Sequence, residues 1–479
     1  MKHRIDRAAR RILAIVTLVT LAVAPGCGKD SPTAPKNSGT SGVPDAAGNF
    51  FVSVATGDDA NGGTKAAPFK TIQKAIDVAA TGNTRADIYV AYGTYSASIA
   101  LRTRMSLHGG YSGSTWVQNL ATDSTVVSGG PVAMTGNNAD SLLIDGFTIR
   151  SADATASGGS SIGIHLLNGS QGVVIANNKI RAGRGKAGAN GVAGASGFDV
   201  VGGGANGANG GGCPNDGGAG QSSTLGSRGG NGGDGSLGDG GDGSAGTGAG
   251  SGAGGTGGNL IGAPNFGLNG GDGYGGLLGV SGGAGASFGA FSGGAYVPAS
   301  GLKGADGQHG GGGGGGGAGV GTLLICGPGG GGGGAGGGGG VGGAGGGGGG
   351  GSFGVVFVQG STGSLLNNVI SANGGGNGGS GGLRGLGGDY GDGGVRGAQA
   401  SDFLGDHTST AGNGGRGGDG GHGGYGGGGG GGPSIGILED ATSSFTRAGN
   451  QTTLGLAGAG GPSISNVGAA GETAEYRKL

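Results

Sequence analysis

The chain has 479 residues, with 146 glycines, 12 prolines and 3 cysteines, and a formal net charge of −1 at pH 7. Glycine approaches its level in collagen, but the scarcity of proline and the many double-glycine GGx runs argue against a collagen triple helix. The slightly acidic charge balance argues against a nucleic-acid-binding surface.

The N-terminus has the pattern of a secretory signal peptide, which we predict to span residues 1–26. Basic MKHRIDRAARR precedes an apolar run, Ile12 to Ala24, that is only thirteen residues long and too short to cross a membrane as a helix. The following APGC resembles the lipobox of bacterial lipoprotein precursors, although Ala24 stands where those proteins usually have Leu. The resemblance implies a lipid on Cys27, a membrane as partner, and a place in the bacterial cell envelope, at the outer membrane or cell surface. Cleavage nearby without lipidation is the alternative.

Residues 27–48 are polar, rich in Pro, Ser and Gly, and without apolar periodicity, so we predict the lipidated Cys27 followed by a flexible tether. Removal of residues 1–26 takes away five basic residues and one acidic residue. The remainder has 21 basic and 26 acidic residues, a net charge near −5, which again argues against nucleic acid as a partner.

Order is expected to begin at Asn49 with a short strand, followed by the turn TGDDANGGT and an amphipathic helix. The helix is predicted because apolar residues recur every three or four positions after Pro68, a residue well suited to a helix start. The apolar positions are Phe69, Ile72, Ala75, Ile76 and Ala79. Such a helix, with one apolar face, must cover part of the fold.

Short segments rich in Val, Ile, Leu and Thr follow, separated by Gly, Asn, Asp and Ser, and they predict strands rather than helices. Their spacing allows apolar positions of successive turns to stack, which is typical of a solenoid. These positions are Leu143, Ile144, Ile149, Ile164, Val174, Ile175 and Ile180.

The opening VSVATGDDANGGTKAAPFKTIQKAID resembles the N-terminal capping motif of right-handed parallel β-helix proteins of the pectate-lyase-like superfamily, especially a surface-protein branch of unknown function. The phrases SLHGGYSGSTW, LLIDGFTI and VVIANNKI resemble rungs of that family. The resemblance covers about residues 49–182. It implies an all-β chain, a right-handed parallel β-helix with an N-terminal capping helix, and it says little of activity, because this fold hosts enzymes, adhesins and binding scaffolds.

Two later segments repeat a coil of this β-helix. SIGIHLLNGSQGVVIANNKIRAG from Ser161 matches SFGVVFVQGSTGSLLNNVISANG from Ser352, and a weaker copy starts at Ser434. Glycine tracts therefore interrupt one solenoid at a single corner, which leaves its stacked core undisturbed. The predicted parts are 1–26 signal peptide, 27–48 tether, 49–182 β-helix with cap, 183–351 glycine-rich insertion, 352–372 coil, 373–432 glycine-rich insertion, 433–461 coil and 462–479 C-terminal tail or cap.

The glycine tracts have a period of three, as from Gly376 to Gly397, where every third residue is glycine. This is the repeat of a polyproline-II-type helix, and such helices can pair N–H with C=O between close neighbours. The tracts resemble polyglycine-II bundle proteins and, in their GGx wording, mycobacterial PGRS repeats. A disordered low-complexity loop is the alternative, and a calcium β-roll finds only one weak match, at Gly229.

Cys213 and Cys326 remain as a candidate disulfide, because an exported chain meets an oxidising compartment; two separate buried thiols are the alternative. In the turn TGDDANGGT, the oxygens of Asp58, Asp59 and Asn61 form a candidate Ca²⁺ site. Asp and Asn in such turns more often hydrogen-bond their own backbone. No other cofactor is expected.

Aromatic residues near the first coils, Tyr111 and Trp116, are candidates for stacking on sugar rings, with a core or capping role as the alternative. A second candidate surface follows from the glycine period, which would display polar and aromatic residues in a row. The row consists of Asn413, Arg416, Asp419, His422 and Tyr425.

Catalysis of the pectate-lyase type needs clustered carboxylates for Ca²⁺ and a basic residue, but Asp123, Asp140 and Asp145 lie on separate predicted turns. We therefore expect a non-catalytic, exported cell-surface lipoprotein with a structural, adhesion or polysaccharide-binding role, in contact with polysaccharide or another cell surface. A polysaccharide lyase-like enzyme and a passive cell-envelope spacer are the alternatives.

Overall fold

The computed structural model describes residues 42–82 and 84–479. The predicted signal peptide, Cys27 and residues 28–41 of the tether lie outside the described residues. The described end of the tether does not behave as a free linker: Val43 packs against Trp116 and donates its amide to the carbonyl of that residue at 3.2 Å. No helix among the described residues has the length and apolar character needed to cross a membrane.

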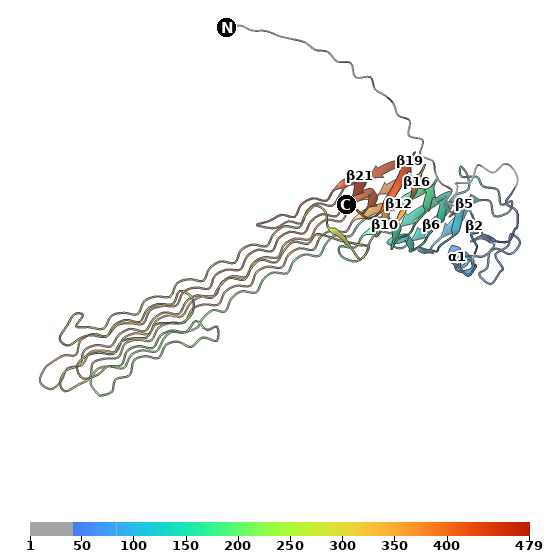
Figure 1. The fold of residues 1–479 in the computed structure, drawn as a ribbon. Helices are drawn as coiled ribbons and strands as arrows, with labels where there is room; N and C mark the ends of the chain where they lie inside the picture. Colours follow the sequence, from blue (N-terminus) through green and yellow to red (C-terminus); the bar gives the residue numbers. More distant parts are fainter. Residues whose placement is uncertain (1–41, 83) are drawn as a thin grey trace, which may run out of the picture. The chain divides into compact units, whose positions relative to one another are not determined.

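Most strands belong to three parallel sheets, here called A, B and C, which the chain visits in turn, as in a parallel β-helix (Figure 1). Sheet A contains β1 (Asn49–Val52), β2 (Ala86–Ala91), β5 (Met105–Tyr111), β8 (Leu142–Asp145), β11 (Val173–Ala176), β16 (Thr362–Leu366) and β19 (Ser444–Ala448). Sheet B contains β3 (Gly93–Tyr95), β6 (Thr125–Gly129), β9 (Phe147–Ser151), β12 (Lys179–Ala182), β17 (Val369–Ala372) and β20 (Gln451–Leu454). Sheet C contains β4 (Ile99–Leu101), β7 (Val132–Asn137), β10 (Ser161–Leu167), β15 (Ser352–Phe357), β18 (Ser434–Glu439) and β21 (Thr473–Lys478).

The core lies between the three sheets and is built from columns of apolar side chains. In sheet A, Leu107 pairs with Ile144, Ile144 with Ile175, and Ile175 with Leu365, and all four are fully buried. Because alternate side chains of a strand point to opposite faces, one apolar residue per coil at a fixed place suffices to extend the column. Burial of each such side chain contributes about 1.5–3 kcal/mol.

One corner of the coils is held by a column of asparagines. Asn178, Asn368 and Asn450 follow sheet A strands in successive coils, and the side-chain oxygen of each later residue accepts the backbone amide of the earlier one at 3.0 Å. The residues before the first two, Asn177 and Asn367, have φ of 55° and 54°, a conformation that asparagine tolerates better than most residues. The Asn-Asn pair thus supplies both the bend and the hydrogen bonds of this corner.

The single helix of the described chain, α1 (Ile72–Ala80), starts at Thr71, whose side chain accepts the amide of Lys74. This is a standard N-cap contact that satisfies a free amide of the first turn. Its apolar face, which includes Ile72 and Ile76, is buried against β1, β2 and β4. The predicted helix therefore exists and packs on the first strands of the solenoid.

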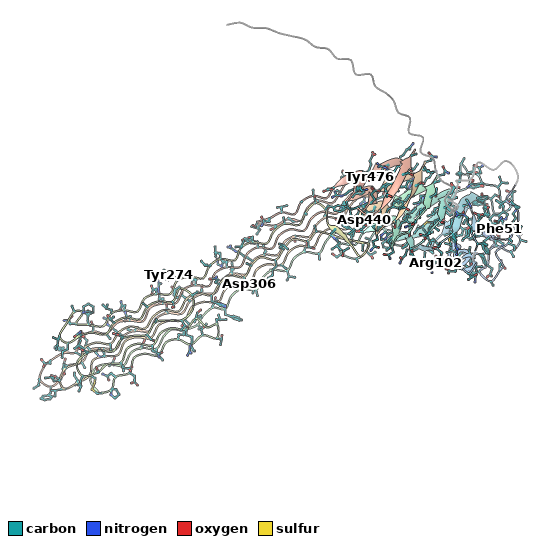
Figure 2. All side chains as sticks on the ribbon, viewed as in Figure 1. Phe51, Arg102, Tyr274, Asp306, Asp440 and Tyr476 are labelled. Atoms are coloured by element: carbon teal, nitrogen blue, oxygen red, sulfur yellow. A yellow bond between two sulfur atoms is a disulfide. The ribbon has the colours of Figure 1, made fainter. Side chains whose placement is uncertain are left out.

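Three glycine-rich segments leave from the corner between sheets B and C. Residues 183–351 connect β12 to β15, residues 373–433 connect β17 to β18, and residues 455–472 connect β20 to β21. Their extended stretches run side by side (Figure 1) and carry their side chains on the outside of the group, as Tyr274 and Asp306 illustrate (Figure 2). Since β21 pairs with β18, residues 462–479, expected as a tail or cap, contain the first strand of a further coil.

The backbone of segment 327–351 shows how these stretches associate. Every third amide from Gly331 to Gly349 donates to a carbonyl between Gly412 and Gly430, at 2.8–3.0 Å. The amides one position further along the three-residue period donate to segment 183–210, as Gly332 does to Ala205. Amides at the third position, from Gly330 to Gly336, donate to carbonyls of residues 227–233. Because segment 327–351 has neighbouring segments in several directions, most of its positions have no room for a side chain, which explains its nearly pure glycine composition. Val341, which is 37% exposed, marks a place where the segment reaches the surface.

A hairpin not expected from the sequence lies at the inner end of the longest insertion. It consists of β13 (Ala290–Ser292) and β14 (Ala295–Val297), which pair antiparallel. Tyr296 is 9% exposed and packs edge-on against Phe353 of sheet C at 5.2 Å between ring centroids. The hairpin therefore attaches the insertion to the outer face of sheet C through an apolar contact.

Candidate functional site

The strongest candidate site is the set of turns at which the glycine segments reverse far from the β-helix, here called the distal tip. It comprises residues 211–215, 236–239, 259–266, 321–326 and 400–409. Each turn interrupts the glycine period with larger residues, as NLIGAPNF and TLLIC show. These interruptions are the sequence signal for the tip. The three-residue glycine period alone did not predict it.

A disulfide and side-chain hydrogen bonds tie these turns together. Cys213 and Cys326 are bonded, with their Cα atoms 5.4 Å apart across a sequence separation of 113 residues. Buried Asn215 donates from Nδ2 to the carbonyl of Gly327 at 2.9 Å, and the Thr322 hydroxyl donates to Asp402 Oδ2 at 3.1 Å. The tip is thus a cross-linked surface built from turns far apart in the sequence.

Large apolar side chains are exposed on this tip. Ile261 is 95% exposed and Leu323 is 91% exposed, although apolar side chains of this size are usually at least partly buried. The exposed set is Leu237, Leu260, Ile261, Phe266, Leu323, Leu324, Phe403 and Leu404. Grouped apolar side chains on a surface of this kind mark interaction sites.

The tip also contains a pocket of ≈ 390 Å³ between three of its turns. Its lining combines apolar and polar groups: Asn259, Leu260, Asn265, Val320, Gly321, Thr322, Leu323, Asp406, His407 and Ser409. His407 is held by a 2.5 Å contact between Nδ1 and the Ser401 hydroxyl, and Ser409 accepts the amide of Val320 at 2.6 Å. A volume of this size suits a small organic ligand.

The predicted row on segment 409–432 is at least partly exposed along its length, with buried glycines between its members. Its side chains contact neighbouring segments. Arg416 donates to the Tyr390 hydroxyl at 3.0 Å and lies 3.6 Å from Asp272 Oδ2, while His422 Nδ1 accepts the amide of Gly387. The guanidinium of Arg384, on a neighbouring glycine segment, lies 5.0 Å from the centroid of the Tyr425 ring. The row therefore also links glycine segments to one another.

A second polar cluster lies on the outer face of sheet A. His108 is 6% exposed, with Nε2 3.4 Å from Asp87 Oδ1 and Nδ1 4.0 Å from Asp145 Oδ2. Tyr89 stacks on its ring, at 5.1 Å between centroids. Consecutive sheet A strands place the three groups together, because Tyr89, His108 and Asp145 pair directly in the β2–β5–β8 register. This cluster was not predicted from the sequence, because its members come from separate coils.

The electrostatics of this cluster favour a charged pair. Burial acts to lower the pKa of His108, but the negative charges of Asp145 and Asp87 and the hydrogen bond to Asp87 outweigh it and raise that pKa. Burial acts to raise the pKa of Asp87, but hydrogen bonds from His108 and Ser106 and nearby positive charge lower it overall. Asp145, itself buried, also accepts Asn177 Nδ2 at 2.7 Å. The arrangement stabilises an imidazolium between two carboxylates.

The remaining predicted carboxylates have separate local partners. Asp140 accepts the amide of Gln171 at 2.8 Å, and Asp123 accepts the hydroxyl of Thr122 at 3.1 Å. In the turn before α1, Asp59 accepts the amides of Lys70 and Thr71 at 3.0 and 2.9 Å. These contacts use the side chains locally, and the three carboxylates considered for catalysis, Asp123, Asp140 and Asp145, each have different partners in the described chain.

The other two residues of the candidate Ca²⁺ site also have backbone partners. Asp58 Oδ1 accepts the amide of Ala60 at 2.9 Å, and Asn61 Nδ2 donates to the carbonyl of Pro68 at 2.9 Å. The described residues contain no group of three or more His, Cys, Asp or Glu side chains arranged to hold a metal ion. Calcium at this turn stays a prediction, while the structure gives these side chains a role in shaping the turn.

Tyr111 and Trp116, the candidates for stacking on sugar rings, are enclosed by other side chains. Each is 3% exposed, and both belong to a cluster with Phe51 and Ala91, in which Trp116 meets Phe51 edge-on at 4.8 Å. A ring enclosed by protein side chains offers no free face to a sugar. Their observed role is to pack the outer side of the first coils, which was the alternative considered from the sequence.

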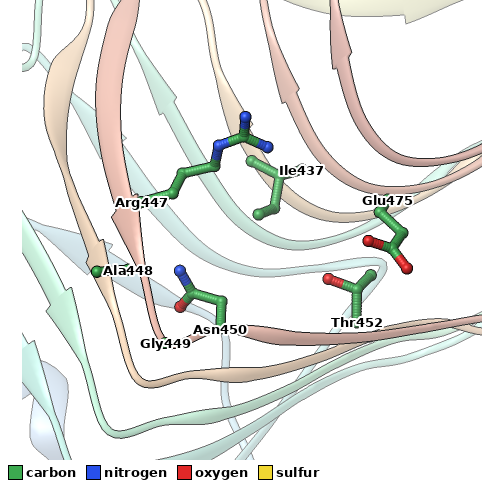
Figure 3. A pocket seen from close by; sticks show the side chains of 7 residues that line it. All are labelled: Ile437, Arg447, Ala448, Gly449, Asn450, Thr452 and Glu475. Atoms are coloured by element: carbon green, nitrogen blue, oxygen red, sulfur yellow. The ribbon is translucent and has the colours of Figure 1, made fainter.

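At the last coil, polar residues occupy core positions around a pocket of ≈ 330 Å³ (Figure 3). Arg447 pairs with Leu365, and Thr452 pairs with Ile370, so each continues an apolar column with a polar side chain. The Arg447 guanidinium lies 3.8 Å from the centroid of the Tyr476 ring. This end of the solenoid is thus covered by amphipathic side chains.

Comparisons with known proteins bear on the first coils. A family model described as Protein of unknown function (DUF1565) matches residues 55–217, which include the His108 cluster. Uncharacterized protein YwoF of Bacillus subtilis (strain 168) is 27% identical over 143 residues, which are 28% of this chain and 29% of YwoF. The chain therefore spans under a third of the length of this relative. No solved structure matches significantly. Residues 55–217 thus resemble a family of unknown function, and this similarity assigns no activity.

Proposed function

We propose that this protein is an exported, lipid-anchored cell-surface adhesin without catalytic activity, whose glycine segments present the distal tip to polysaccharide or another cell surface. The observation that carries the proposal is the grouping of exposed apolar side chains, such as Ile261, Leu323 and Phe403, on turns at the far end of these segments. A passive spacer would not need an apolar tip, because exposed apolar groups promote association.

The proposal includes a mechanical role for the glycine segments as a polyglycine-II bundle. The three-residue period of their hydrogen bonds supports this assignment, because polyproline-II-type helices have three residues per turn. Bonds between segments supply the partners that an isolated helix of this kind lacks. The β-helix, right-handed as parallel crossover connections almost always are, would serve as the rigid base.

The test uses bacteria that export the full-length chain. Cells carry the wild type, a tip variant with Ile261→Ser, Leu323→Ser and Phe403→Ser, or a control with Val192→Ser, Leu277→Ser and Val280→Ser. The control residues are similarly exposed but lie along the glycine segments. Retention of labelled envelope polysaccharides and of other cells should fall for the tip variant only. Absence of retention by the wild type would favour the spacer, and equal retention by all three would contradict a role for the tip.

The anchor has its own test. Metabolic labelling with a radioactive fatty acid should mark the wild type and leave a Cys27→Ser variant unlabelled and released from the membrane fraction. A wild type that stays unlabelled, or a labelled Cys27→Ser variant, would show that Cys27 is not the attachment point.

A further inference from the structure

We propose that the pocket of the distal tip binds one neutral sugar unit of a polysaccharide. This inference rests on the proposed adhesion function and names the site and the ligand class that it would use. The pocket lies where residues 259–265, 320–323 and 406–409 meet, so three separate reversals of the chain contribute to it. Its ≈ 390 Å³ falls in the range of small-molecule sites.

The polar side chains of the pocket keep hydrogen-bonding atoms that have no partner within the described protein, and two of these side chains are held in place by local hydrogen bonds. Asn259 Oδ1 accepts the amide of Ile261 at 3.1 Å, which fixes the side chain and leaves Nδ2 free. His407 Nδ1 contacts the Ser401 hydroxyl, which orients the ring and leaves Nε2 free. The Asn265 amide and the Asp406 carboxylate have no side-chain partner within the described chain. Donors and acceptors of both kinds therefore face a ligand without first having to break an internal bond.

The apolar part of the lining matches the other half of a sugar ring. Leu260, Val320 and Leu323 line the same pocket as these polar groups. A pyranose presents hydroxyls at its edge and C–H groups on its face, so it needs hydrogen-bonding partners and an apolar surface side by side. A purely apolar ligand would leave the polar groups of the lining without partners, which is unfavourable.

The charge of the lining distinguishes neutral from acidic sugars as ligands. The lining contains no Lys or Arg, and Asp406 contributes a negative charge. Phosphate, sulfate and uronate groups are usually bound by Arg, Lys or helix N-termini, and a carboxylate repels them. The pocket therefore favours a neutral sugar over an acidic one. Carboxylate and amide oxygens accept hydroxyl donors, and the free Nδ2 of Asn259 is available as a donor.

The experiment measures binding of the full-length mature protein to methyl glycosides of glucose, galactose, mannose and N-acetylglucosamine by titration calorimetry, and to immobilised neutral and acidic polysaccharides. Asn265→Ala and Asp406→Asn should each weaken binding of the neutral ligand about tenfold, the loss expected for one hydrogen bond. Both residues are exposed, so these variants should fold normally, which circular dichroism checks. Val280→Ala, at an exposed position along the glycine segments that does not line the pocket, should bind within about twofold of the wild type.

Several results would overturn the inference. Unchanged affinity in both pocket variants, a preference for acidic polysaccharides, or binding that disappears when EDTA removes divalent cations would each contradict direct recognition of a neutral sugar. If cells carrying the protein adhere while none of the glycosides or neutral polysaccharides binds, the pocket inference fails and the adhesion function stands. If neither adhesion nor binding occurs, both fail.

Discussion

Asn368 donates from Nδ2 to Oδ1 of Asn450 at 2.9 Å, although 82 residues separate them in the chain. The intervening residues include a whole glycine-rich insertion, residues 373–433, which leaves the solenoid after β17 and returns before β18. The same Asn368 accepts the amide of Asn178, 190 residues earlier, across the longest insertion. The asparagine column thus continues past both insertions without change of register.

Replacement of Asn368 by Leu should destabilise the β-helix. The buried amide of Asn178 and the carbonyl of Ile175 would lose their partner, and an unsatisfied buried group costs about 1–3 kcal/mol. We expect a loss of about 2–3 kcal/mol in the free energy of unfolding, measured by chemical denaturation. Asn137→Ala, which removes an exposed asparagine pair with Asn168, is the control and should change it by less than about 0.5 kcal/mol. Equal effects of the two variants would contradict a special role for the column.

Gly334→Val tests the close packing of the glycine segments. A Cβ at Gly334 would lie 1.9 Å from the carbonyl oxygen of Gly391, so a neighbouring backbone must move. Overpacking costs about 1–3 kcal/mol, and hydrogen exchange of amides in segments 327–351 and 373–399 should accelerate. Gly212→Ala, where a Cβ meets no atom within 4 Å, should leave exchange unchanged. Identical exchange in both variants would show that the segments are not packed in this way.

The His108 cluster predicts a pH-dependent contribution to stability. Because the folded-state pKa of His108 is raised, its contribution is fully present below its unfolded value of about 6.5 and is lost as pH rises through the folded pKa. Asp87 has a lowered pKa, so its contribution is present above about pH 4 and is lost as pH falls through the folded pKa. The facing groups are Asp87 from β2, Asp145 from β8, and the rings of Tyr89 and Tyr111.

His108→Gln should therefore lower Tm more at pH 5 than at pH 9. Thermal unfolding of both proteins across this range measures the difference, and an NMR titration of the His108 ring in the wild type checks the raised pKa directly. Asn137→Ala, which removes no titratable group, is the control and should give the same small difference at both pH values. A destabilisation by His108→Gln that grows with pH would show that the buried imidazole is neutral.

The disulfide between Cys213 and Cys326 should stabilise the distal tip. Closure of a loop of this length is worth up to about 4–5 kcal/mol in the chain-entropy model, and about 2–4 kcal/mol is typical. Cys213→Ser with Cys326→Ser should lower the midpoint of denaturation, and a reducing agent should lower that of the wild type alone. If the reducing agent shifted the double variant equally, the effect would not come from this bond.

Tyr296→Ala should detach the hairpin from sheet C. Tyr296 packs against Phe353, and its hydroxyl accepts the amide of Gly289 at 3.0 Å, so the variant loses both apolar burial and a hydrogen bond. We expect a cost of about 3–4 kcal/mol for the local structure, seen as faster hydrogen exchange in residues 287–298. Tyr92→Ala, a more exposed tyrosine of the first coils, is the control. Slow exchange in the hairpin despite the substitution would mean that other contacts hold it.

Much of the architecture is readable from local periods. Short segments rich in Val, Ile, Leu and Thr, such as those around Ile144 and Ile175, predicted strands, and the repeated Ser-x-Gly and Asn-Asn-x-Ile phrases predicted equivalent coils on either side of the insertions. The three parallel sheets, visited in turn, agree with that prediction, and α1 is the only helix among the described residues. The sequence also predicted that the insertions leave the solenoid at the same corner, because each glycine tract begins at the same point after its coil.

The sequence by itself determined most of the elements and their order, because strand composition, the amphipathic helix and the glycine period depend on neighbours within a few residues. It did not predict the hairpin of β13 and β14 or the strand β21. Tertiary structure alone decided which elements meet. His108 lies between Asp87 and Asp145 because three coils align, and the pocket forms because turns near Leu260, Leu323 and His407 reverse at the same end of the glycine segments. The purest glycine tract, 327–351, is largely interior because backbone hydrogen bonds join it to stretches of residues 186–233, 301–316, 376–397 and 412–430, and its composition alone left both an interior place and a slack loop open. Such relationships depend on pairing between residues 21–190 positions apart, which no local period records.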